Sequence, residues 1–201
     1  MRNEQRMNLQ EEKQVLRRMM RARLAEQDPE ERAMRSSAAC SHLIAHPAFA
    51  RAGLLLAYCA TPQECDPKQA VEAARAAGKR VAFPLCLPGN QLALYEPLTS
   101  DALVPGKYGI FEPVPARSRH IAPEEVEFAI IPGMAFGRDC TRLGHGAGYY
   151  DRLLPRLSCL KAGLAFDFQV FGTVPQGEWD SKMDLIAENN GIIVNKMHFR
   201  L

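Results

Sequence analysis

The sequence predicts an α/β protein: a three-layer α/β/α sandwich with a mostly parallel central sheet. Apolar runs of strand length alternate with amphipathic stretches of helical period, which is typical of a parallel sheet covered by helices. The chain has 201 residues, 47% of them hydrophobic and 24% charged, as in an ordinary globular protein. We therefore expect a single domain over residues 1–201.

The first two predicted elements are helices. Residues 1–8 are expected to be disordered, and apolar residues on one arc predict a helix over 9–26. Asp28 and Pro29 then provide an N-cap and a first-turn proline for a helix that reaches about residue 44. On the first helix, Lys13 and Arg17 lie one turn apart. They form either a solvated face or an arm that reaches a polyphosphate, and periodicity alone leaves both interpretations open.

A strand–helix–strand unit is predicted next. The apolar run 54–60 predicts a buried strand, Asp66 and Pro67 begin a helix through residue 77, and 81–87 is the following strand. After the turn at 88–90, residues 91–95 are expected to pair antiparallel to that strand.

The second half continues the alternation. Residues 97–123 are rich in proline and are expected to form a functional surface segment. A strand over 127–131 leads to a glycine-rich loop, followed by a helix over 149–157 and a strand over 161–166. Near the end, 184–187 and 192–194 flank a turn.

Composition excludes several classes of function. The formal net charge of +2 provides no broad cationic field, so we expect no nucleic-acid partner. No apolar run is long enough to span a membrane and no signal peptide is recognisable, so the expected location is cytoplasmic, and we expect a monomer. The six cysteines lack a CxxC pair and are expected to be free thiols. Cys140 lies near the glycine-rich loop, but no pattern marks it as a catalytic thiol.

The richest stretch in chemistry runs from Arg142 to Asp151. Glycines at alternate positions let backbone N–H groups approach a ligand, and a helix follows, as in many phosphate-binding loops. Arg142 offers a charged fork and Asp151 offers an oxygen ligand for a divalent cation. The spacing matches neither Walker A nor the dinucleotide fingerprint, so an ordinary turn remains an alternative. Glu64 follows another strand and should reach the same edge of the sheet.

Four sequence features together resemble the 5-formyltetrahydrofolate cyclo-ligase family. They are Lys13 with Arg17, Pro-Gln-Glu ending at Glu64, Pro-Gly-Met-Ala-Phe at 132–136, and Arg-Leu-Gly-His-Gly-Ala-Gly-Tyr-Tyr-Asp at 142–151. The resemblance covers nearly all of the chain from about Lys13 to Val194. It implies the α/β/α fold and an ATP- and Mg²⁺-dependent closure of 5-formyltetrahydrofolate to 5,10-methenyltetrahydrofolate, with release of ADP and phosphate.

The resemblance also implies roles for individual residues. ATP would contact Lys13, Arg17, Arg142, Leu143, Gly144, His145, Gly146, Ala147, Gly148, Tyr149 and Tyr150, with Arg142 and Tyr150 as catalytic residues. The folate would contact Cys59, Glu64, Tyr108, His145, Gly146, Gly148 and Tyr149, and Glu64 would meet the pterin. Asp151 and Asp180 would bind Mg²⁺.

In the family, the formyl oxygen attacks the γ-phosphate and N10 then displaces the phosphate, so no nucleophilic side chain is required. Trp179 stands where the family usually has histidine, and Ala187 or Glu188 replaces an often-seen threonine. Trp179 cannot act as an imidazole acceptor or proton relay. This departure supports one alternative, a paralogue that binds folate or nucleotide with weak or no turnover. A second alternative is another ATP-dependent ligase or phosphotransferase on the same scaffold, because one fold can host many chemistries.

Overall fold

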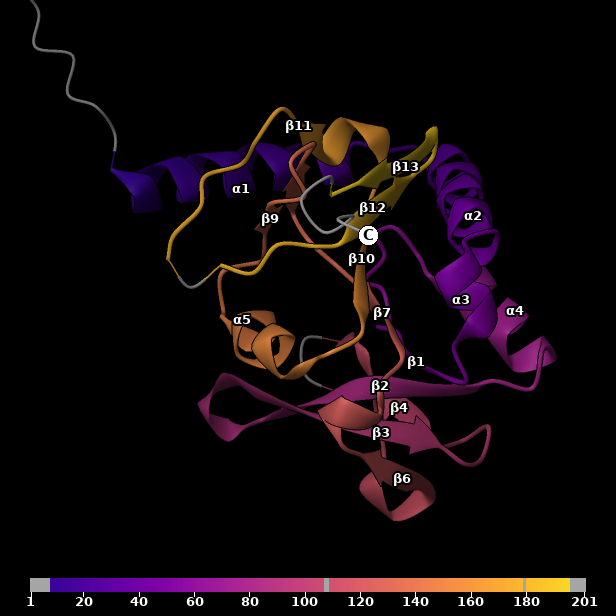
Figure 1. Cartoon of the computed structure of the whole chain (residues 1–201). Helices are drawn as coiled ribbons and strands as arrows, with labels where there is room; N and C mark the ends of the chain where they lie inside the picture. Colours follow the sequence, from indigo (N-terminus) through magenta and orange to yellow (C-terminus); the bar gives the residue numbers. More distant parts are fainter. Residues whose placement is uncertain (1–7, 107–108, 179, 196–201) are drawn as a thin grey trace, which may run out of the picture.

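The fold is built on an eight-stranded sheet in the order β13-β12-β10-β7-β1-β2-β3-β6 (Figure 1). The computed structural model describes residues 8–106, 109–178 and 180–195. The strands from β12 to β2 are parallel, whereas β13, β3 and β6 pair antiparallel at the two sides. The predicted mostly parallel sheet is thus confirmed. The strands are β1 Leu54–Leu56, β2 Arg80–Leu87, β3 Gln91–Pro97, β6 Ser118–Ile121, β7 Phe128–Ile131, β10 Leu160–Leu164, β12 Leu185–Glu188 and β13 Gly191–Val194.

Helices cover the two faces of this sheet unequally. One face carries α1 to α4, and the other carries the short helix α5 and a 3₁₀ turn, η5 (Figure 1). A small sheet, β11-β8-β9, lies under α1 at the top of the view. These elements are α1 Leu9–Ala25, α2 Pro29–Ile44, α3 Pro47–Arg51, α4 Lys68–Ala76, α5 Tyr149–Leu153, η5 Leu154–Arg156, β8 Ala135–Gly137, β9 Arg142–Leu143 and β11 Val170–Phe171.

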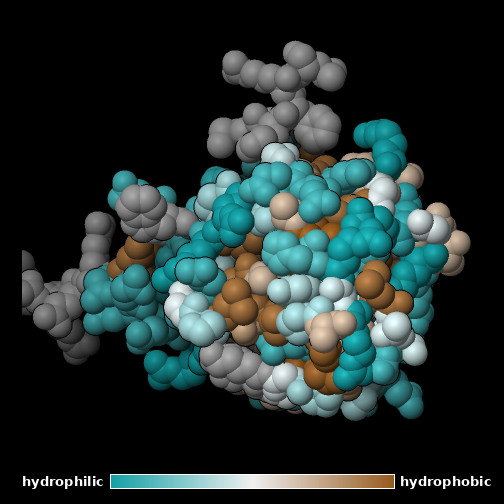
Figure 2. All heavy atoms as spheres, turned by 90° about the horizontal axis from the view of Figure 1, so that it is seen from below, coloured by the Kyte–Doolittle hydropathy of each residue, from teal (hydrophilic) through white to brown (hydrophobic). Residues whose placement is uncertain are grey.

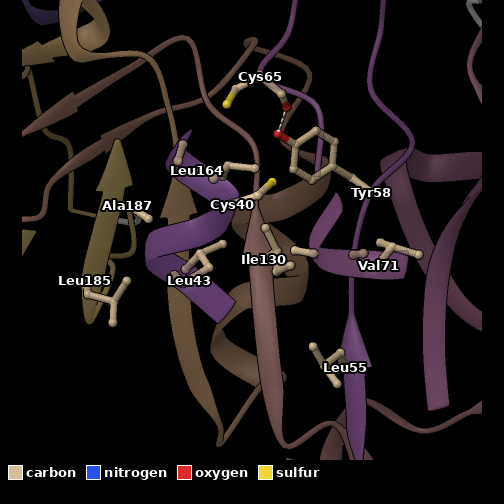
Figure 3. Packing of buried hydrophobic residues seen from close by; sticks show 14 of the residues in the cluster. Cys40, Leu43, Leu55, Tyr58, Cys65, Val71, Ile130, Leu164, Leu185 and Ala187 are labelled. Atoms are coloured by element: carbon tan, nitrogen blue, oxygen red, sulfur yellow. Dashed lines mark hydrogen bonds between the residues drawn. The ribbon is translucent and has the colours of Figure 1, made fainter. Parts of the chain in front are cut away.

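Residues of the central strands are buried on both faces and alternate between two apolar clusters. Leu55 packs toward α2 and α4, whereas Leu54 and Leu56 pack toward α5 and η5. Figure 3 shows Cys40 and Leu43 of α2 lying over Ile130 of β7. Burial of each large aliphatic side chain contributes about 1.5–3 kcal/mol, so this packing fixes the strand ends from which the site extends.

The helix starts follow the predicted capping chemistry, with two corrections. Asp28 accepts hydrogen bonds from the N–H groups of Glu30 and Glu31, as expected. Asn8, expected within the disordered end, is instead the N-cap of α1, because it forms a capping box with Glu11. Residues 1–7 lie outside the described residues. The helix expected from Asp66 begins at Lys68, whose N–H donates to the Asp66 carboxylate.

Several predicted elements are shorter than expected. The strand expected over 54–60 ends at Leu56, after which the chain leaves the sheet toward the site. The helix expected over 149–157 is α5 followed by η5, because Pro155 lacks the N–H that an α-helix needs. The strand expected over 161–166 is β10, which begins and ends earlier.

The proline-rich stretch 97–123 contains more regular structure than a surface segment. It forms the hairpin of β4 (Leu103–Pro105) and β5 (Phe111–Pro113) and then supplies β6 to the central sheet. Short 3₁₀ turns complete the fold: η1 Pro88–Asn90, η3 Pro115–Arg117, η4 Pro123–Glu125 and η6 Asp167–Gln169.

Seen from the side of β2, β3 and β6, the molecule shows apolar residues as small separate patches among polar ones (Figure 2). None of the described helices has the length and apolar character needed to cross a membrane. The single-domain organisation stays a prediction.

Candidate active site

A pocket of about 440 Å³ lies where the chain leaves the carboxyl ends of β1 and β7. We call it the central pocket. Its walls come from the segment after β1, from β2 and β3, from the β5 hairpin and from the glycine-rich loop. The predicted site residues that line it are Cys59, Glu64, Arg142, Gly144, His145, Gly146, Ala147, Gly148, Tyr149, Tyr150 and Asp151.

The glycines of the loop are required by backbone conformation and by space. Gly146 and Gly148 have φ values of +105° and +75°, where other residues are strained. A Cβ on Gly144 would lie 2.9 Å from Nη2 of Arg142. Because Gly144 has no Cβ, the loop can pack directly against the guanidinium of Arg142, and the backbone N–H groups of the loop remain close to the pocket.

Arg142 is a buried cation under this loop. Its Nε donates to the carbonyl of Pro132 at 2.9 Å, and its Nη1 donates to Oδ1 of Asp151 at 3.2 Å. The guanidinium also lies 5.3 Å from the ring centroid of Tyr150. Burial lowers the pKa of Arg142 from its ordinary value, while Asp151 acts in the opposite direction. The side chain thus brings a fixed positive charge to the pocket wall.

Glu64 also lines the central pocket and already has two hydrogen-bond donors. The N–H of Thr61 donates to Oε2 at 2.8 Å, and Nε2 of His145 lies 2.9 Å from Oε1. Burial by itself would raise the pKa of Glu64, but the interactions with His145 and Thr61 outweigh it and hold the pKa below its ordinary value. The carboxylate is therefore charged at neutral pH.

A hydrogen bond within the segment after β1 positions Glu64. The hydroxyl of Tyr58 donates to the carbonyl of Cys65, so the two ends of the turn that carries Glu64 are tied together (Figure 3). Both residues are buried in the hydrophobic cluster that also contains Cys40 and Leu43 of α2. The core thereby fixes where Glu64 enters the pocket.

The basic residues of α1 support the glycine-rich loop from outside the central pocket. Nε of Arg17 donates to the carbonyl of Gly144 at 2.9 Å. Lys13 is buried and forms an ion pair with Oδ2 of Asp180, which also accepts from the N–H of Gly177 at 2.6 Å. The phosphate-binding cation and the metal-binding carboxylate suggested by the sequence are thus paired with each other.

Not every predicted site residue lines the central pocket. Lys13, Arg17 and Asp180 lie beside the loop, and Leu143 is buried in β9. Tyr108 and Trp179 lie outside the described residues. Ala187 and Glu188 belong to β12, where Glu188 accepts a hydrogen bond from the N–H of Asn190.

The Cys59 thiol and the Tyr150 hydroxyl are neutral at physiological pH. Burial raises the pKa of Cys59 to about 12 and raises the pKa of Tyr150 further above its ordinary value. Cys140 is fully buried, does not line the pocket, and has a pKa raised by burial to about 11. A catalytic thiol at Cys140 therefore has no support from the structure.

Sequence reasoning missed part of the pocket wall. The missed residues belong mainly to β2, β3 and the β5 hairpin, and they are Tyr58, Thr61, Pro84, Cys86, Leu92, Ile110, Phe111, Glu112 and Pro132. The β2 residues could have been predicted from the strand expected over 81–87, because the carboxyl ends of parallel strands meet at the same edge of the sheet. No local sequence pattern predicts that the β4–β5 hairpin folds back against the pocket.

Comparison with known proteins identifies the family. The family model described as 5-formyltetrahydrofolate cyclo-ligase family matches residues 9–189. The chain belongs to the 5-formyltetrahydrofolate cyclo-ligase family. The expectation drawn from the sequence motifs is confirmed for the family and for the enzyme class, a ligase of folate one-carbon metabolism.

The similarity to individual relatives extends over most of the length of both chains. The 5-formyltetrahydrofolate cyclo-ligase of Escherichia coli (strain K12) is 31% identical over 177 residues, which cover 84% of this chain and 96% of the relative. A protein of Caenorhabditis elegans described as a probable 5-formyltetrahydrofolate cyclo-ligase is 30% identical over 92% of this chain and 97% of its own length. The NMR structure of Aquifex aeolicus 5,10-methenyltetrahydrofolate synthetase matches with a TM-score of 0.83 and 32% identity, covering 94% of this chain and 95% of that one.

Proposed function

We propose that this chain closes 5-formyltetrahydrofolate to 5,10-methenyltetrahydrofolate in the central pocket, using ATP and Mg²⁺ and releasing ADP and phosphate. The supporting observation is the 2.9 Å approach of His145, from the glycine-rich loop, to Glu64, from the segment after β1. A folate held by Glu64 would lie against a loop suited to phosphate. Such proximity is the main requirement for transfer between two bound substrates.

Glu64 is proposed to orient the pterin. A charged carboxylate accepts hydrogen bonds from adjacent N–H donors, and the amino and ring N–H groups of a pterin are such donors. Thr61 fixes one oxygen of Glu64, while His145 holds the other and would yield it to the ligand. Cys59, which carries a protonated thiol, would form part of the adjacent wall.

The glycine-rich loop, Arg17, Lys13 and Arg142 are proposed to bind the phosphates of ATP. Arg142 is held by two acceptors before any ligand arrives, so it requires little reorganisation when charge develops on the transferring phosphoryl group. Tyr150 lies beside this guanidinium, and its hydroxyl, whose pKa is raised, stays protonated and thus able to donate a hydrogen bond.

Asp151 and Asp180 fit Mg²⁺ as a pair of oxygen donors. Each carboxylate contacts a cation of the proposed phosphate-binding set: Asp151 accepts from Arg142, and Asp180 is paired with Lys13. Within the described residues no three His, Cys, Asp or Glu side chains form a complete metal cage. Mg²⁺ typically uses one or two carboxylates together with substrate phosphates, so this donor set suits it. Bound there, the ion would neutralise charge on the phosphates.

The proposed reaction needs only binding, orientation and charge from the protein. The formyl oxygen forms a bond to the γ-phosphorus as the bond to ADP breaks. N10 then bonds to the formyl carbon and loses its proton to the departing phosphate, which leaves with the former formyl oxygen. Arg142 and the loop N–H groups would stabilise the transferring phosphoryl group, while Glu64 would hold the pterin in the orientation that the reaction needs. No side chain becomes covalently modified.

Absorbance tests the proposal directly. Purified protein, MgATP and 5-formyltetrahydrofolate should produce the near-ultraviolet band of the methenyl product. Asp151→Ala should lower the rate ~100-fold or more, because a ligand of the phosphate-bound metal is lost. Asp101→Ala, which removes an exposed carboxylate paired with Arg117, is the matched control and should keep the wild-type rate.

The alternatives have distinct outcomes. A flat trace from folded protein that binds both ATP and folate would favour a binding paralogue, and ATP binding without any folate effect would favour another ligase or phosphotransferase. The cytoplasmic location and the monomeric state remain predictions, and one relative, from Arabidopsis thaliana, is described as mitochondrial.

A further inference from the structure

One face of α1 contacts the glycine-rich loop from outside the central pocket. α1 lies over the small sheet whose strand β9 leads into the loop (Figure 1). Lys13, Arg17 and Arg21 follow one another at intervals of four residues, so they share this face. Nε of Arg17 donates to the carbonyl of Gly144 at 2.9 Å, and Nη2 of Arg21 donates to the carbonyl of His145 at 3.5 Å. Two cations of one helix thus hold two consecutive carbonyls of the loop.

The two arginines lie close to each other, which costs electrostatic energy. Arg17 and Arg21 are one helical turn apart, and like charges at this spacing repel. Burial lowers the pKa of Arg17, and the charge of Arg21 lowers it further, although nearby carboxylates oppose the shift. Among the described residues Arg21 has no carboxylate partner, so its acceptor is the carbonyl of His145. The loop carbonyls therefore compensate charges that would otherwise separate.

A carbonyl turned toward α1 turns the N–H group of the same peptide away from α1. The described peptide bonds are trans, and in a trans peptide the C=O and N–H bonds point in opposite directions. The carbonyl of Gly144 shares its peptide with the N–H of His145, and the carbonyl of His145 shares its peptide with the N–H of Gly146. These three residues line the central pocket, whereas Arg17 and Arg21 do not. The two N–H groups are therefore directed toward the pocket.

The N–H groups of the loop are available to a ligand. Within the described part of the chain, no acceptor is paired with the backbone N–H groups of residues 145–148. Donors fixed in direction before a ligand arrives stabilise an anion with little reorganisation. Gly146 permits the close packing of α1 on the loop, because a Cβ there would lie 3.3 Å from Cζ of Arg17.

We propose that Arg21 is a positioning residue for the glycine-rich loop: together with Arg17 it holds the loop carbonyls outside the pocket, so that the N–H groups of His145 and Gly146 face the phosphates of ATP. This inference rests on the proposed function, because it takes the position of the phosphates from there. Arg21 acts through the loop and does not itself contact the nucleotide. Arg17 can do both, because only its Nε is bonded to a described residue and its Nη groups remain for a phosphate.

Backbone amide resonances of the ¹⁵N-labelled whole chain test the inference without requiring turnover. In the wild-type protein, MgATP should shift the amide proton resonances of His145 and Gly146 downfield as these groups donate to phosphate oxygens. Arg21→Gln should reduce these shifts and weaken MgATP binding about two- to fivefold, the effect of one modest hydrogen bond. Adenosine has no phosphates and should bind Arg21→Gln as tightly as the wild type. Arg21→Lys keeps the charge and should restore most of the shifts and of the affinity.

Arg18→Gln is the matched control. Arg18 is exposed on the same helix and makes no hydrogen bond or ion pair to a described residue, so its replacement should change neither the amide shifts nor MgATP affinity. Arg21 is also exposed, and both variants should unfold at the wild-type temperature. A change in the amide shifts is then an effect on the loop and not on the fold.

The outcomes separate the two proposals. Amide resonances of His145 and Gly146 that ignore MgATP, or that respond equally in Arg21→Gln, overturn the inference even when methenyl product forms normally. Equal losses of affinity for MgATP and adenosine in Arg21→Gln also overturn it, because they show a general disturbance of the pocket. A response that depends on Arg21, in protein that forms no product, supports the inference and overturns the proposed reaction. Failure to bind MgATP overturns both.

Discussion

The imidazole Nε2 of His145 lies 2.9 Å from Oε1 of Glu64, so the glycine-rich loop and the segment after β1 are in direct contact at the wall of the central pocket. A pterin that binds Glu64 must therefore replace a protein donor as well as water. His145→Ala should leave Glu64 without this donor and change folate affinity more than ATP affinity. Titration of the variant with each ligand measures the two effects separately. Equal changes in both affinities would contradict this interpretation.

The pKa of Glu64 predicts how stability depends on pH. Burial opposes ionisation, but His145 and Thr61 hold the pKa below its ordinary value of 4.5. A carboxyl whose pKa is lowered by folding stabilises the fold above its unfolded pKa, and this contribution disappears as the pH falls through the folded pKa. The wild-type protein should therefore lose free energy of unfolding below about pH 4.5, and Glu64→Gln should lose less over the same range.

Urea unfolding at a series of pH values measures this difference. Glu72→Gln, at an exposed position on α4, is the control and should follow the wild-type curve. Parallel curves for wild type and Glu64→Gln would show that the pKa of Glu64 is the same in the folded and unfolded chain.

Tyr58 should affect only the part of the pocket that we propose to bind folate. Tyr58→Phe removes the hydrogen bond to the buried carbonyl of Cys65 and should lower the free energy of unfolding by about 1–3 kcal/mol. Glu64 then becomes less well positioned, so folate affinity should fall while ATP affinity is kept. Tyr95→Phe, on β3 against His120, is the control. Loss of both affinities to the same degree would refute a local role.

The buried ion pair between Lys13 and Asp180 should show strong coupling. Removal of one partner leaves the other charge poorly compensated, so Lys13→Met and Asp180→Asn should each lower the free energy of unfolding by about 3 kcal/mol. The double variant should lose much less than the sum. The exposed pair Arg35 and Glu31 on α2 is the reference cycle, with coupling of about 0.3–0.5 kcal/mol. Additive losses at Lys13 and Asp180 would exclude a stabilising pair.

Gly144 should be intolerant of a methyl group. Gly144→Ala places Cβ 2.9 Å from the guanidinium of Arg142, which is held by Pro132 and Asp151, and we expect destabilisation of about 1–3 kcal/mol with weaker ATP binding. At Gly172 a Cβ meets nothing within 4 Å, so Gly172→Ala should stay within about 0.5 kcal/mol of wild type. Thermal unfolding and nucleotide titration compare the two, and equal tolerance would mean that Arg142 moves freely.

The fold could be predicted largely from local patterns. Asp28 with Pro29 marks a helix start by capping chemistry, and Leu54 to Leu56 form a buried strand because every side chain is apolar. The ends of elements were less predictable. Pro155 ends α5, and the chain continues as the 3₁₀ turn η5. β6 joins the sheet by pairing with β3, and no pattern within residues 118–121 predicts this pairing.

The site could be predicted where its residues are contiguous. The glycine-rich loop and Glu64 lie on the pocket because both follow strands that end at one edge of the sheet. Contacts from distant segments could not be anticipated in detail. The pairing of Lys13 with Asp180, and of Arg17 with the carbonyl of Gly144, depends on how α1 packs over the small sheet.

The contacts of α1 also constrain the order in which the chain folds. Lys13 and Asp180 are separated by 167 positions, and Arg17 and Gly144 by 127. On the ribosome, α1 emerges long before either partner, and contacts between such distant segments form late because loop closure must come first. The wall that we propose to bind ATP is thus completed only after residue 180 has been synthesised, so a growing chain can bury much of its core before it forms this wall.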